Sequence, residues 1–199
     1  MPGTNIGTGN YVPPDLLKSR GYTFVRLVSL PNAEDYAALC RARQIAVLAV
    51  VTGESQGYVL GNADVHQFDN ERDLDQSPSD YQLNATFYQR TYPHLNWIAC
   101  GMAKGSPLWW RDVAALGLPG FSGFAVHPYG KTASQAATLI NSYKSYTPNM
   151  DCWITEWVRP AAEIPGYQKM LRERAVHAFW FCEDCGVEGF SAPPLIFHV

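Results

Sequence analysis

Short runs rich in β-branched and aromatic residues recur along the chain, and segments with apolar residues at helical spacing separate most of them. The predicted strands are 4–7, 22–29, 45–51, 64–68, 96–101, 121–126, 151–155 and 187–192. The predicted helices are 13–20, 33–43, 78–92, 107–116, 132–146 and 166–185. Strands that alternate with helices predict an α/β protein with a parallel sheet built from βαβ units.

The number of predicted strands favours a closed barrel. Eight strands in 199 residues leave about 25 residues for each unit, which is enough for a compact (β/α)8 TIM barrel occupying 1–199 as a single domain. The segment 52–63 has three glycines and no apolar period, so we expect the third helix to be stunted. Only 193–199 follows the last predicted strand, so the eighth helix should be stunted too. An open, doubly wound sheet also fits the alternation.

Composition excludes several classes of protein. Hydrophobic residues make up 47% of the chain and charged residues 17%, which predicts a folded core rather than disorder. The net charge of −3 offers no basic field, so we expect no nucleic-acid partner. No apolar run approaches the ~20 residues that a membrane helix needs, so we expect no membrane span. The N-terminus lacks the features of a signal peptide, and this leaves the localisation open.

The cysteines suggest one minor alternative. Their number is five, and most lie in apolar segments, which argues against a disulfide framework. Cys182 and Cys185 form a C-x-x-C motif, the basis of a remote redox or zinc hypothesis. The motif falls at the end of a predicted helix, where the dipole disfavours a thiolate, and no second pair has zinc-site spacing. We therefore expect no metal and no cofactor.

Polar and aromatic side chains gather at the ends of the predicted strands. In a parallel barrel the C-terminal strand ends carry the catalytic residues, so these side chains are the candidate site residues. They are Arg26, Asn70, Glu71, His127, Tyr129, Glu156 and Trp157. Carboxyl groups that follow an apolar strand are partly desolvated, and desolvation moves a carboxyl pKa toward a catalytic value.

Glu71 and Glu156 are the candidate catalytic pair. Two facing carboxyl groups can split a glycosidic bond, since one protonates the leaving oxygen while the other attacks the anomeric carbon. Either residue alone is more often a solvated loop residue or a helix N-terminal cap, but two of them, on strands four and seven, favour a function. For a retaining mechanism we expect the two carboxyl groups to lie roughly 5–5.5 Å apart.

The sequence resembles the clan A glycoside hydrolases, a group of retaining (β/α)8 enzymes. That clan carries an Asn-Glu pair at the end of strand four and a Glu at the end of strand seven. Asn70-Glu71 and Glu156 match these two patterns, and the match extends to Arg26 on strand two and to the His-Pro-Tyr that starts at His127. The resemblance implies double-displacement hydrolysis of the O-glycosidic bonds of a poly- or oligosaccharide, with Glu71 as acid/base and Glu156 as nucleophile.

The resemblance also implies roles for the neighbouring polar residues. Asn70 would donate to the sugar 2-hydroxyl, although a helix cap is the alternative. Arg26 and Tyr129 would hydrogen-bond the carboxylate of Glu156 and keep its pKa low. The alternatives are an ion pair at the rim for Arg26 and a packed aromatic for Tyr129.

Less specific roles fall to the histidine and the tryptophans. His127 would contact the sugar or orient Glu71, and a purely structural histidine is the alternative. Trp157 would form a stacking wall for a sugar ring. Trp109 and Trp110 are adjacent on a predicted helix, so at most one should face the cleft, and core packing is the better interpretation.

The sequence departs from the clan at its C-terminal end. The clan usually has a Trp at the end of strand eight, and the predicted strand 187–192 contains none. Trp180 falls in the predicted helix, although 178–182 as strand eight is an alternative. Without an eighth helix, apolar surface would be exposed, so we expect a homo-oligomer or a missing flanking domain. A non-catalytic carbohydrate-binding TIM barrel is the alternative function.

Overall fold

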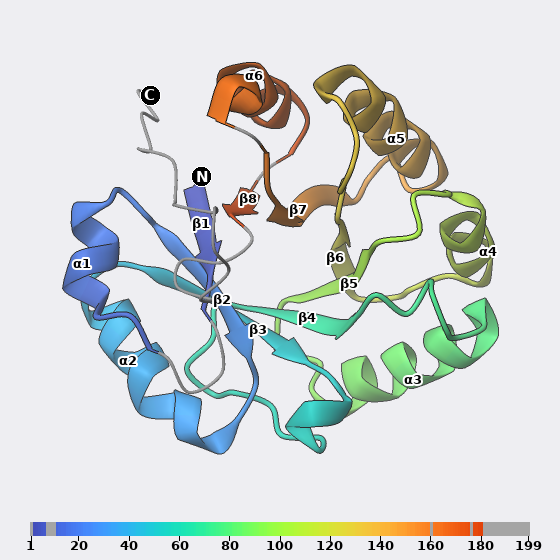
Figure 1. Ribbon diagram of the computed structural model, residues 1–199. Helices are drawn as coiled ribbons and strands as arrows, with labels where there is room; N and C mark the ends of the chain where they lie inside the picture. The colour runs from blue at the N-terminus through green and yellow to red at the C-terminus, as the bar shows by residue number, and fades with distance from the viewer. Residues whose placement is uncertain (1, 7–10, 160, 176, 181–199) are drawn as a thin grey trace.

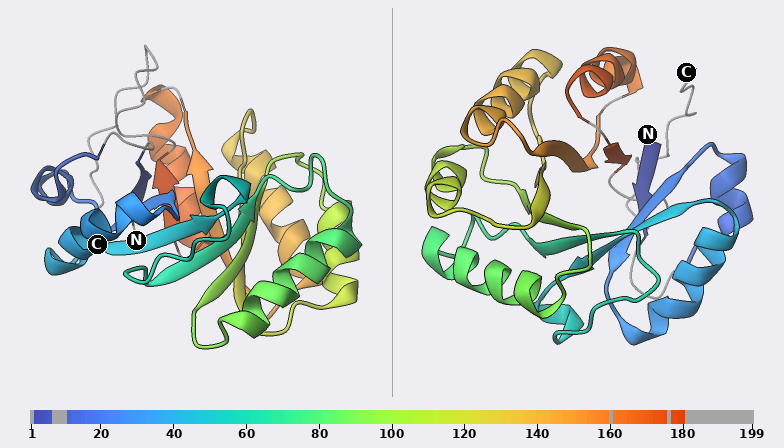
Figure 2. Two further views of the ribbon diagram at one scale, coloured as in Figure 1. Left: turned by 90° about the horizontal axis from the view of Figure 1, so that it is seen from below. Right: turned by 180° about the vertical axis from the view of Figure 1, so that it is seen from behind.

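The computed structural model describes residues 2–6, 11–159, 161–175 and 177–180, and within them eight parallel strands close into a barrel in sequence order. The strands are β1 (Pro2–Asn5), β2 (Phe24–Val28), β3 (Ala46–Val51), β4 (Val65–Asn70), β5 (Trp97–Met102), β6 (Phe121–Val126), β7 (Asp151–Trp157) and β8 (His177–Trp180). The α-helices are α1 (Pro14–Ser19), α2 (Glu34–Ala42), α3 (Pro78–Thr91), α4 (Leu108–Leu116), α5 (Ala133–Tyr146) and α6 (Ile164–Arg174). The helices surround the strands (Figure 1), and the view from behind in Figure 2 shows the same ring. The predicted TIM barrel is confirmed.

Apolar side chains fill both faces of the barrel wall. The ring of Phe24 on β2 contacts Trp153 on β7 and Phe179 on β8, neither of which neighbours β2, so these contacts cross the interior. Two further clusters occupy the layer between the strands and the helices. Strands covered on both faces must be apolar at nearly every position, and this is why their runs stand out in the sequence.

Local signals in the sequence determine where the helices begin and end. The side chain of Ser77 caps α3 by accepting a hydrogen bond from the backbone N–H of Asp80 at 3.2 Å. Thr132 and Gln135 form a reciprocal capping box at the start of α5. Gly117 ends α4 with a φ of 83°, which favours glycine. The first five predicted helices are confirmed to within one residue at either end.

The third helix is stunted, as predicted. Between β3 and β4 the structure has only a single turn of 3₁₀ helix, Gly53–Ser55, followed by a loop (Figure 1). The predicted stunted eighth helix, the C-x-x-C motif and the strand 187–192 lie outside the described residues. The extension of the domain to residue 199 and the expected self-association stay predictions. None of the described helices is long and apolar enough to cross a membrane.

The prediction for strand eight was wrong. Helix α6 ends at Arg174, Ala175 adopts an extended conformation, and the eighth strand is His177–Trp180. Ala178 packs in the outer cluster and Phe179 in the interior cluster, which is the alternation of a strand. No glycine or proline separates the helix from the strand here. The apolar residues of the strand continue the helical spacing, and the predicted helix 166–185 therefore runs past the true end of α6. Strand eight therefore overlaps the alternative placement at 178–182, and its last residue is Trp180.

Tyr81 on α3 links two strands, and we expect its hydroxyl to be important for stability. The fully buried hydroxyl donates to the carbonyl of Phe68 on β4 at 3.2 Å and accepts from the N–H of Cys100 on β5 at 2.8 Å. Tyr81→Phe removes both hydrogen bonds in a buried place, so we expect the free energy of unfolding to fall by about 1–3 kcal/mol. Urea unfolding measures this change. Tyr146→Phe, on an exposed tyrosine, is the control, and equal stability of the two variants would contradict the prediction.

Candidate active site

Glu156 lies near the end of β7, where the strand is irregular. Ile154 and Trp157 both pack in the outer cluster, although regular alternation would place them on opposite faces. The pairing of β7 with β8 shifts register between these two residues, which is the mark of a bulge. The extra residue allows Thr155 and Glu156 to approach His127 together.

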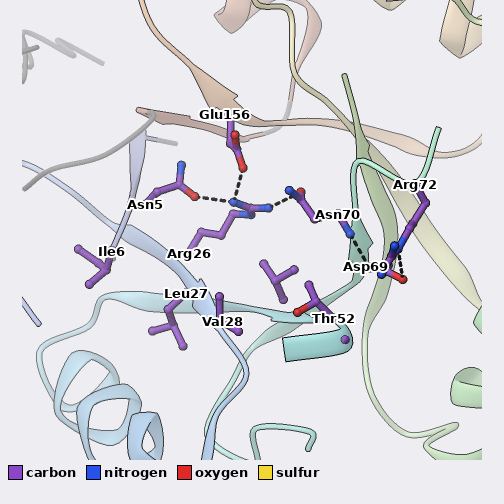
Figure 3. A pocket seen from close by; sticks show the side chains of 12 residues that line it. Asn5, Ile6, Arg26, Leu27, Val28, Thr52, Asp69, Asn70, Arg72 and Glu156 are labelled. Carbon is purple, nitrogen blue, oxygen red and sulfur yellow. Dashed lines mark hydrogen bonds and ion pairs between the residues drawn. The ribbon is translucent and has the colours of Figure 1, made fainter. Parts of the chain in front are cut away.

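Arg26 on β2 is the centre of a polar network at the mouth of the barrel. Its guanidinium donates to Glu156 at 2.8 Å, to Asn5 at 2.7 Å and to Asn70 at 2.7 Å (Figure 3). The Nε–H of Arg26 donates to Gln67 at 3.1 Å. The arginine is only 7% exposed, and its donors therefore join the ends of β1, β2, β4 and β7 around one buried charge.

The surroundings of Glu156 keep its carboxylate ionised. Burial alone raises the pKa of Glu156, but the nearby His127 ring and the positive charge of Arg26, together with hydrogen bonds from Tyr129 and Arg26, outweigh burial and hold the pKa below its usual value. The hydroxyl of Tyr129 donates to Oε2 at 2.5 Å. Burial and the negative charge of Glu156 raise the pKa of Tyr129, so the phenol keeps the proton that it donates.

Glu71 is held by an unusual backbone at the end of β4. Asp69 and Glu71 have φ values of 65° and 55°, a region that residues other than glycine rarely adopt. The N–H of Glu71 donates to the carbonyl of Gly101 at 2.9 Å, and the Asp69 carboxylate accepts from the N–H of Asn70 at 3.0 Å. Asp69 also pairs with Arg72 at 2.8 Å. Such strain is typical of functional sites, where neighbouring contacts maintain it.

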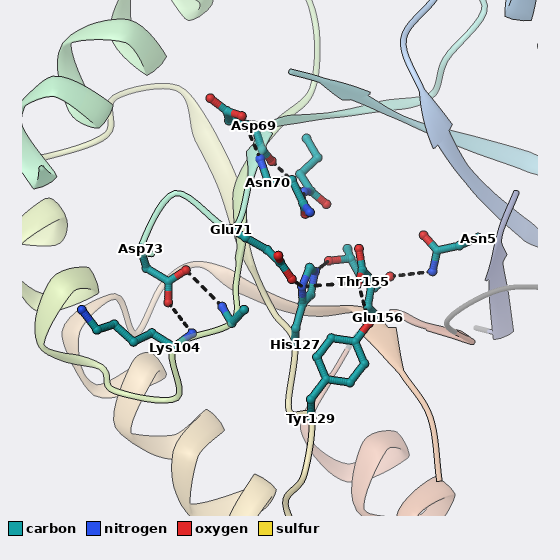
Figure 4. Close-up of polar contacts among 12 residues, drawn as sticks. Asn5, Asp69, Asn70, Glu71, Asp73, Lys104, His127, Tyr129, Thr155 and Glu156 are labelled. Carbon is teal, nitrogen blue, oxygen red and sulfur yellow. Dashed lines mark hydrogen bonds and ion pairs between the residues drawn. The ribbon is translucent and has the colours of Figure 1, made fainter. Parts of the chain in front are cut away.

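His127, directly after β6, lies between the two carboxylates. Its Nδ1 is 3.0 Å from Glu71 Oε1 and 3.6 Å from Glu156 Oε2, and its Nε2 is 3.0 Å from Thr155 Oγ1 (Figure 4). One carboxylate oxygen of Glu71 and one of Glu156 lie within 4.8 Å of each other. The fold therefore brings together two carboxyl groups that are far apart in the sequence.

A cleft of about 580 Å³ opens beside Glu156 (Figure 3). Its described lining consists of Asn5, Ile6, Arg26, Leu27, Val28, Val50, Thr52, Gly53, Asp69, Asn70, Arg72 and Glu156. The Oδ1 of Asn70 accepts from Arg26 at 2.7 Å and from Gln67 at 3.2 Å. These two donors orient the amide so that its NH₂ group is available to a ligand in the cleft.

The carboxylates and the histidine also have a spacing that a metal ion could use. Glu71, His127 and Glu156 each bring one donor atom within 4.8 Å of the others. The donors already bond to protein groups, because Arg26 and Tyr129 hold both oxygens of Glu156. An incoming cation would have to compete with the guanidinium for this carboxylate. The expectation that the protein works without a metal stays a prediction, which metal analysis of the purified protein tests.

The interpretation of Trp157 as a sugar-stacking wall was wrong. The tryptophan is only 2% exposed, and its ring stacks on Tyr167 of α6 with centroids 5.6 Å apart. The bulge in β7 directs Trp157 into the layer between barrel and helices. Trp110 is fully buried, as core packing predicts, and the indole of the half-buried Trp109 donates to the carbonyl of Gln76 at 2.7 Å.

Sequence reasoning overlooked three polar residues of the site. Asn5 and Gln67 hold Arg26, and Thr155 contacts His127. All three are polar side chains inside or at the end of strands that are otherwise apolar. A polar residue in a strand buried on both faces needs a buried partner, and this signal could have identified them.

Comparisons with known proteins reveal similarity of fold only. No family model matches the sequence, and no curated protein matches it. The structure is similar to a GH30 endoxylanase from Clostridium papyrosolvens C71, with a TM-score of 0.65 and 12% identity over 92% of this chain and 65% of that chain. It is also similar to a GH128 (subgroup VI) exo-β-1,3-glucanase from Aureobasidium namibiae, with a TM-score of 0.66 and 14% identity over 96% of this chain and 88% of that chain.

The chain shares the TIM-barrel fold of these two glycoside hydrolases. It spans slightly less than two thirds of the endoxylanase chain, at 65%. An HpcH/HpaI aldolase from Desulfitobacterium hafniense DCB-2 also matches, with a TM-score of 0.60 and 10% identity over 91% of this chain and 85% of that chain. Because one barrel supports different reactions, the function has to be argued from the site residues.

Proposed function

We propose that the protein is a retaining glycoside hydrolase that cleaves O-glycosidic bonds by double displacement. The observation that carries this proposal is the approach of a Glu71 oxygen to within 4.8 Å of a Glu156 oxygen at the mouth of the barrel. Inverting enzymes keep their carboxyl groups roughly 6.5–9.5 Å apart to make room for a water molecule. The short separation favours direct attack by one carboxylate instead.

Glu156 is the nucleophile in this proposal and Glu71 the acid/base. Glu156 is ionised and held by Arg26 and Tyr129, so it attacks the anomeric carbon while the bond to the leaving oxygen breaks. Glu71, whose side chain is 34% exposed, transfers its proton to that oxygen. A water molecule then attacks the glycosyl ester, Glu71 accepts the water's proton, and Glu156 leaves as a carboxylate.

The surroundings of the pair support a poly- or oligosaccharide as substrate. The NH₂ group of Asn70 faces the cleft as a donor for a sugar 2-hydroxyl. A second hollow of about 390 Å³ adjoins the cleft, and both linings include Thr52, Gly53, Asp69 and Arg72. Two adjoining hollows have room for more than one sugar ring, and this favours a chain of sugars over a single unit.

A panel of 2-deoxy-2-fluoro glycosides with activated leaving groups tests the proposal. The expected result is an adduct that increases the mass by one sugar unit, with peptide mapping locating it on Glu156. The sugar that reacts fastest identifies the substrate preference. An adduct on another residue would contradict the assignment of the nucleophile. Binding of glycans with neither adduct nor turnover would favour the carbohydrate-binding barrel.

Gly101→Ala is expected to impair catalysis by displacing His127. A Cβ atom at position 101 would clash with the His127 ring at Nε2, so the ring would have to move from the position in which it contacts Glu71. A displacement of about 1 Å can lower the rate by about 100-fold, and we expect a loss of kcat of that order. Hydrolysis of an aryl glycoside measures the effect, with circular dichroism to verify folding. Gly166→Ala is the matched control, since its added Cβ meets nothing within 4 Å; a folded Gly101→Ala variant with normal kcat would contradict the prediction.

A further inference from the structure

Hydrogen bonds connect Thr155 through the ring of His127 to Glu71. Thr155 Oγ1 is 3.0 Å from Nε2, and Nδ1 is 3.0 Å from Glu71 Oε1. We propose that Thr155 is a positioning residue that fixes His127 as a neutral imidazole with its proton on Nδ1, so that the ring donates a hydrogen bond to Glu71. The consequence for catalysis rests on the proposed function, whereas the tautomer is a property of the free protein.

Burial determines the direction of the hydrogen bond between Thr155 and His127. Thr155 is fully buried and the His127 side chain is inaccessible to solvent. A buried hydroxyl hydrogen needs an acceptor, and within the described part of the chain the bonded partner of this hydroxyl is Nε2. Nε2 therefore accepts and carries no proton, and a neutral ring then has its proton on Nδ1.

The opposite arrangement is unfavourable at both ends of the ring. A proton on Nε2 would donate to Thr155 and leave the hydroxyl hydrogen without a partner, which costs free energy in a buried place. In the neutral ring, the bare Nδ1 would then face carboxylate oxygens of Glu71 at 3.0 Å and of Glu156 at 3.6 Å. With the proton on Nδ1, the positive end of the N–H bond faces both carboxylates.

Neighbouring groups hold the ring and the threonine in place. Asn5 donates to the carbonyl of Thr155 at 2.9 Å and accepts from Arg26 at 2.7 Å. Gly101 has no Cβ to obstruct the ring.

The electrostatic surroundings of His127 come from several elements. Glu71 at the end of β4, Glu156 on β7 and Tyr129 after β6 are the titratable groups that face the ring. Arg26 on β2 acts through its bond to Glu156. The two carboxylates favour an N–H group at Nδ1, and the Thr155 hydroxyl occupies Nε2 on the other side of the ring.

The fixed tautomer keeps the catalytic proton on Glu71. In the first step Glu71 gives its proton to the leaving oxygen, and Nδ1–H stabilises the resulting carboxylate without transferring a proton. In the second step the same carboxylate accepts a proton from water. His127 begins and ends each step with one proton on Nδ1, so the proton balance of the reaction involves Glu71 alone.

Nitrogen-15 NMR of the histidine-labelled protein tests the tautomer directly. In the wild type at neutral pH we expect a protonated Nδ1 and an unprotonated Nε2 for His127. Thr155→Val preserves the shape of the side chain and removes the hydroxyl that donates to Nε2, so the fraction of His127 protonated at Nε2 should rise. Thr155→Ser keeps the hydroxyl and is expected to restore the wild-type signature. A protonated Nε2 in the wild type, in a neutral ring or an imidazolium, would overturn the proposal.

Kinetics test the consequence for Glu71. Without the hydroxyl, an unprotonated Nδ1 can accept from the protonated acid and retain its proton. We therefore expect Thr155→Val to lower kcat about tenfold for poor leaving groups and to move the basic limb of the pH profile to higher pH. An unchanged profile in a folded Thr155→Val variant would overturn the link to Glu71. Absence of any hydrolysis in the wild type would instead refute the proposed function, while the NMR result still decides the tautomer.

Discussion

Glu156→Gln is expected to abolish turnover, with a loss in kcat on the order of 10⁴-fold or more. The glutamine has nearly the same shape, and its amide still contacts Arg26 and Tyr129. It carries no negative charge, so it cannot attack the anomeric carbon to form the glycosyl ester. Initial rates with an aryl glycoside bearing a good leaving group measure the loss, because this substrate needs no acid and isolates the nucleophile.

The control for this variant has to exclude unfolding. Glu156 is 8% exposed and neutralises Arg26, so removal of its charge leaves a buried cation without its partner. Circular dichroism and thermal unfolding verify that the variant is folded. Glu173→Gln makes the same chemical change on an exposed residue of α6 and should keep full activity. A folded Glu156→Gln variant that hydrolyses the substrate at the normal rate would remove the assignment.

Glu71→Ala is expected to slow hydrolysis in a way that depends on the leaving group. General acid catalysis contributes about 10²–10⁴-fold, and only a poor leaving group needs this help in the first step. We therefore expect kcat/KM to fall strongly for an unactivated oligosaccharide and little for a dinitrophenyl glycoside. The second step loses its general base with either substrate, so the glycosyl-enzyme should accumulate and produce a burst of leaving group.

Azide provides an independent test of the same residue. The alanine leaves space beside Glu156 at the mouth of the barrel, and a small anion can occupy it and attack the glycosyl-enzyme without a base. We expect azide to restore turnover and to produce a glycosyl azide with retained configuration. Glu71→Gln, which fills the space, is the matched control and should respond much less. An equal loss with all leaving groups and no azide product would contradict the role of Glu71.

Local sequence patterns were sufficient for most of the barrel. Strands such as β3 are apolar at every position because both faces are covered, and helices such as α3 and α5 carry their own caps in Ser77 and Thr132. Both signals depend on neighbours in sequence. The prediction of strand eight failed because the four residues of this strand continue the apolar spacing of α6. Only pairing with β1 and β7 distinguishes strand from helix there.

Part of the candidate site could be predicted from the sequence for a similar reason. Because the active end of a parallel barrel is formed by strand ends, Arg26, Glu71 and Glu156 could be selected from their positions alone. The direction of a side chain near a strand end depends on bulges and on strained backbone. The shift in β7 turns Trp157 away from the cleft, and no property of the residue itself indicates this.

By itself, the sequence determined the alternation of strands and helices and the strand ends that carry the carboxylates, because burial and capping act over a few residues, and the number of strands favoured a barrel over an open sheet. The tertiary structure alone decided that Glu71 and Glu156 approach each other, that Arg26 bonds to Asn5 and Gln67, and that Thr155 contacts His127. These contacts join residues from distant segments. Their geometry depends on strand register and bulges, which arise only when the closed barrel aligns the strands.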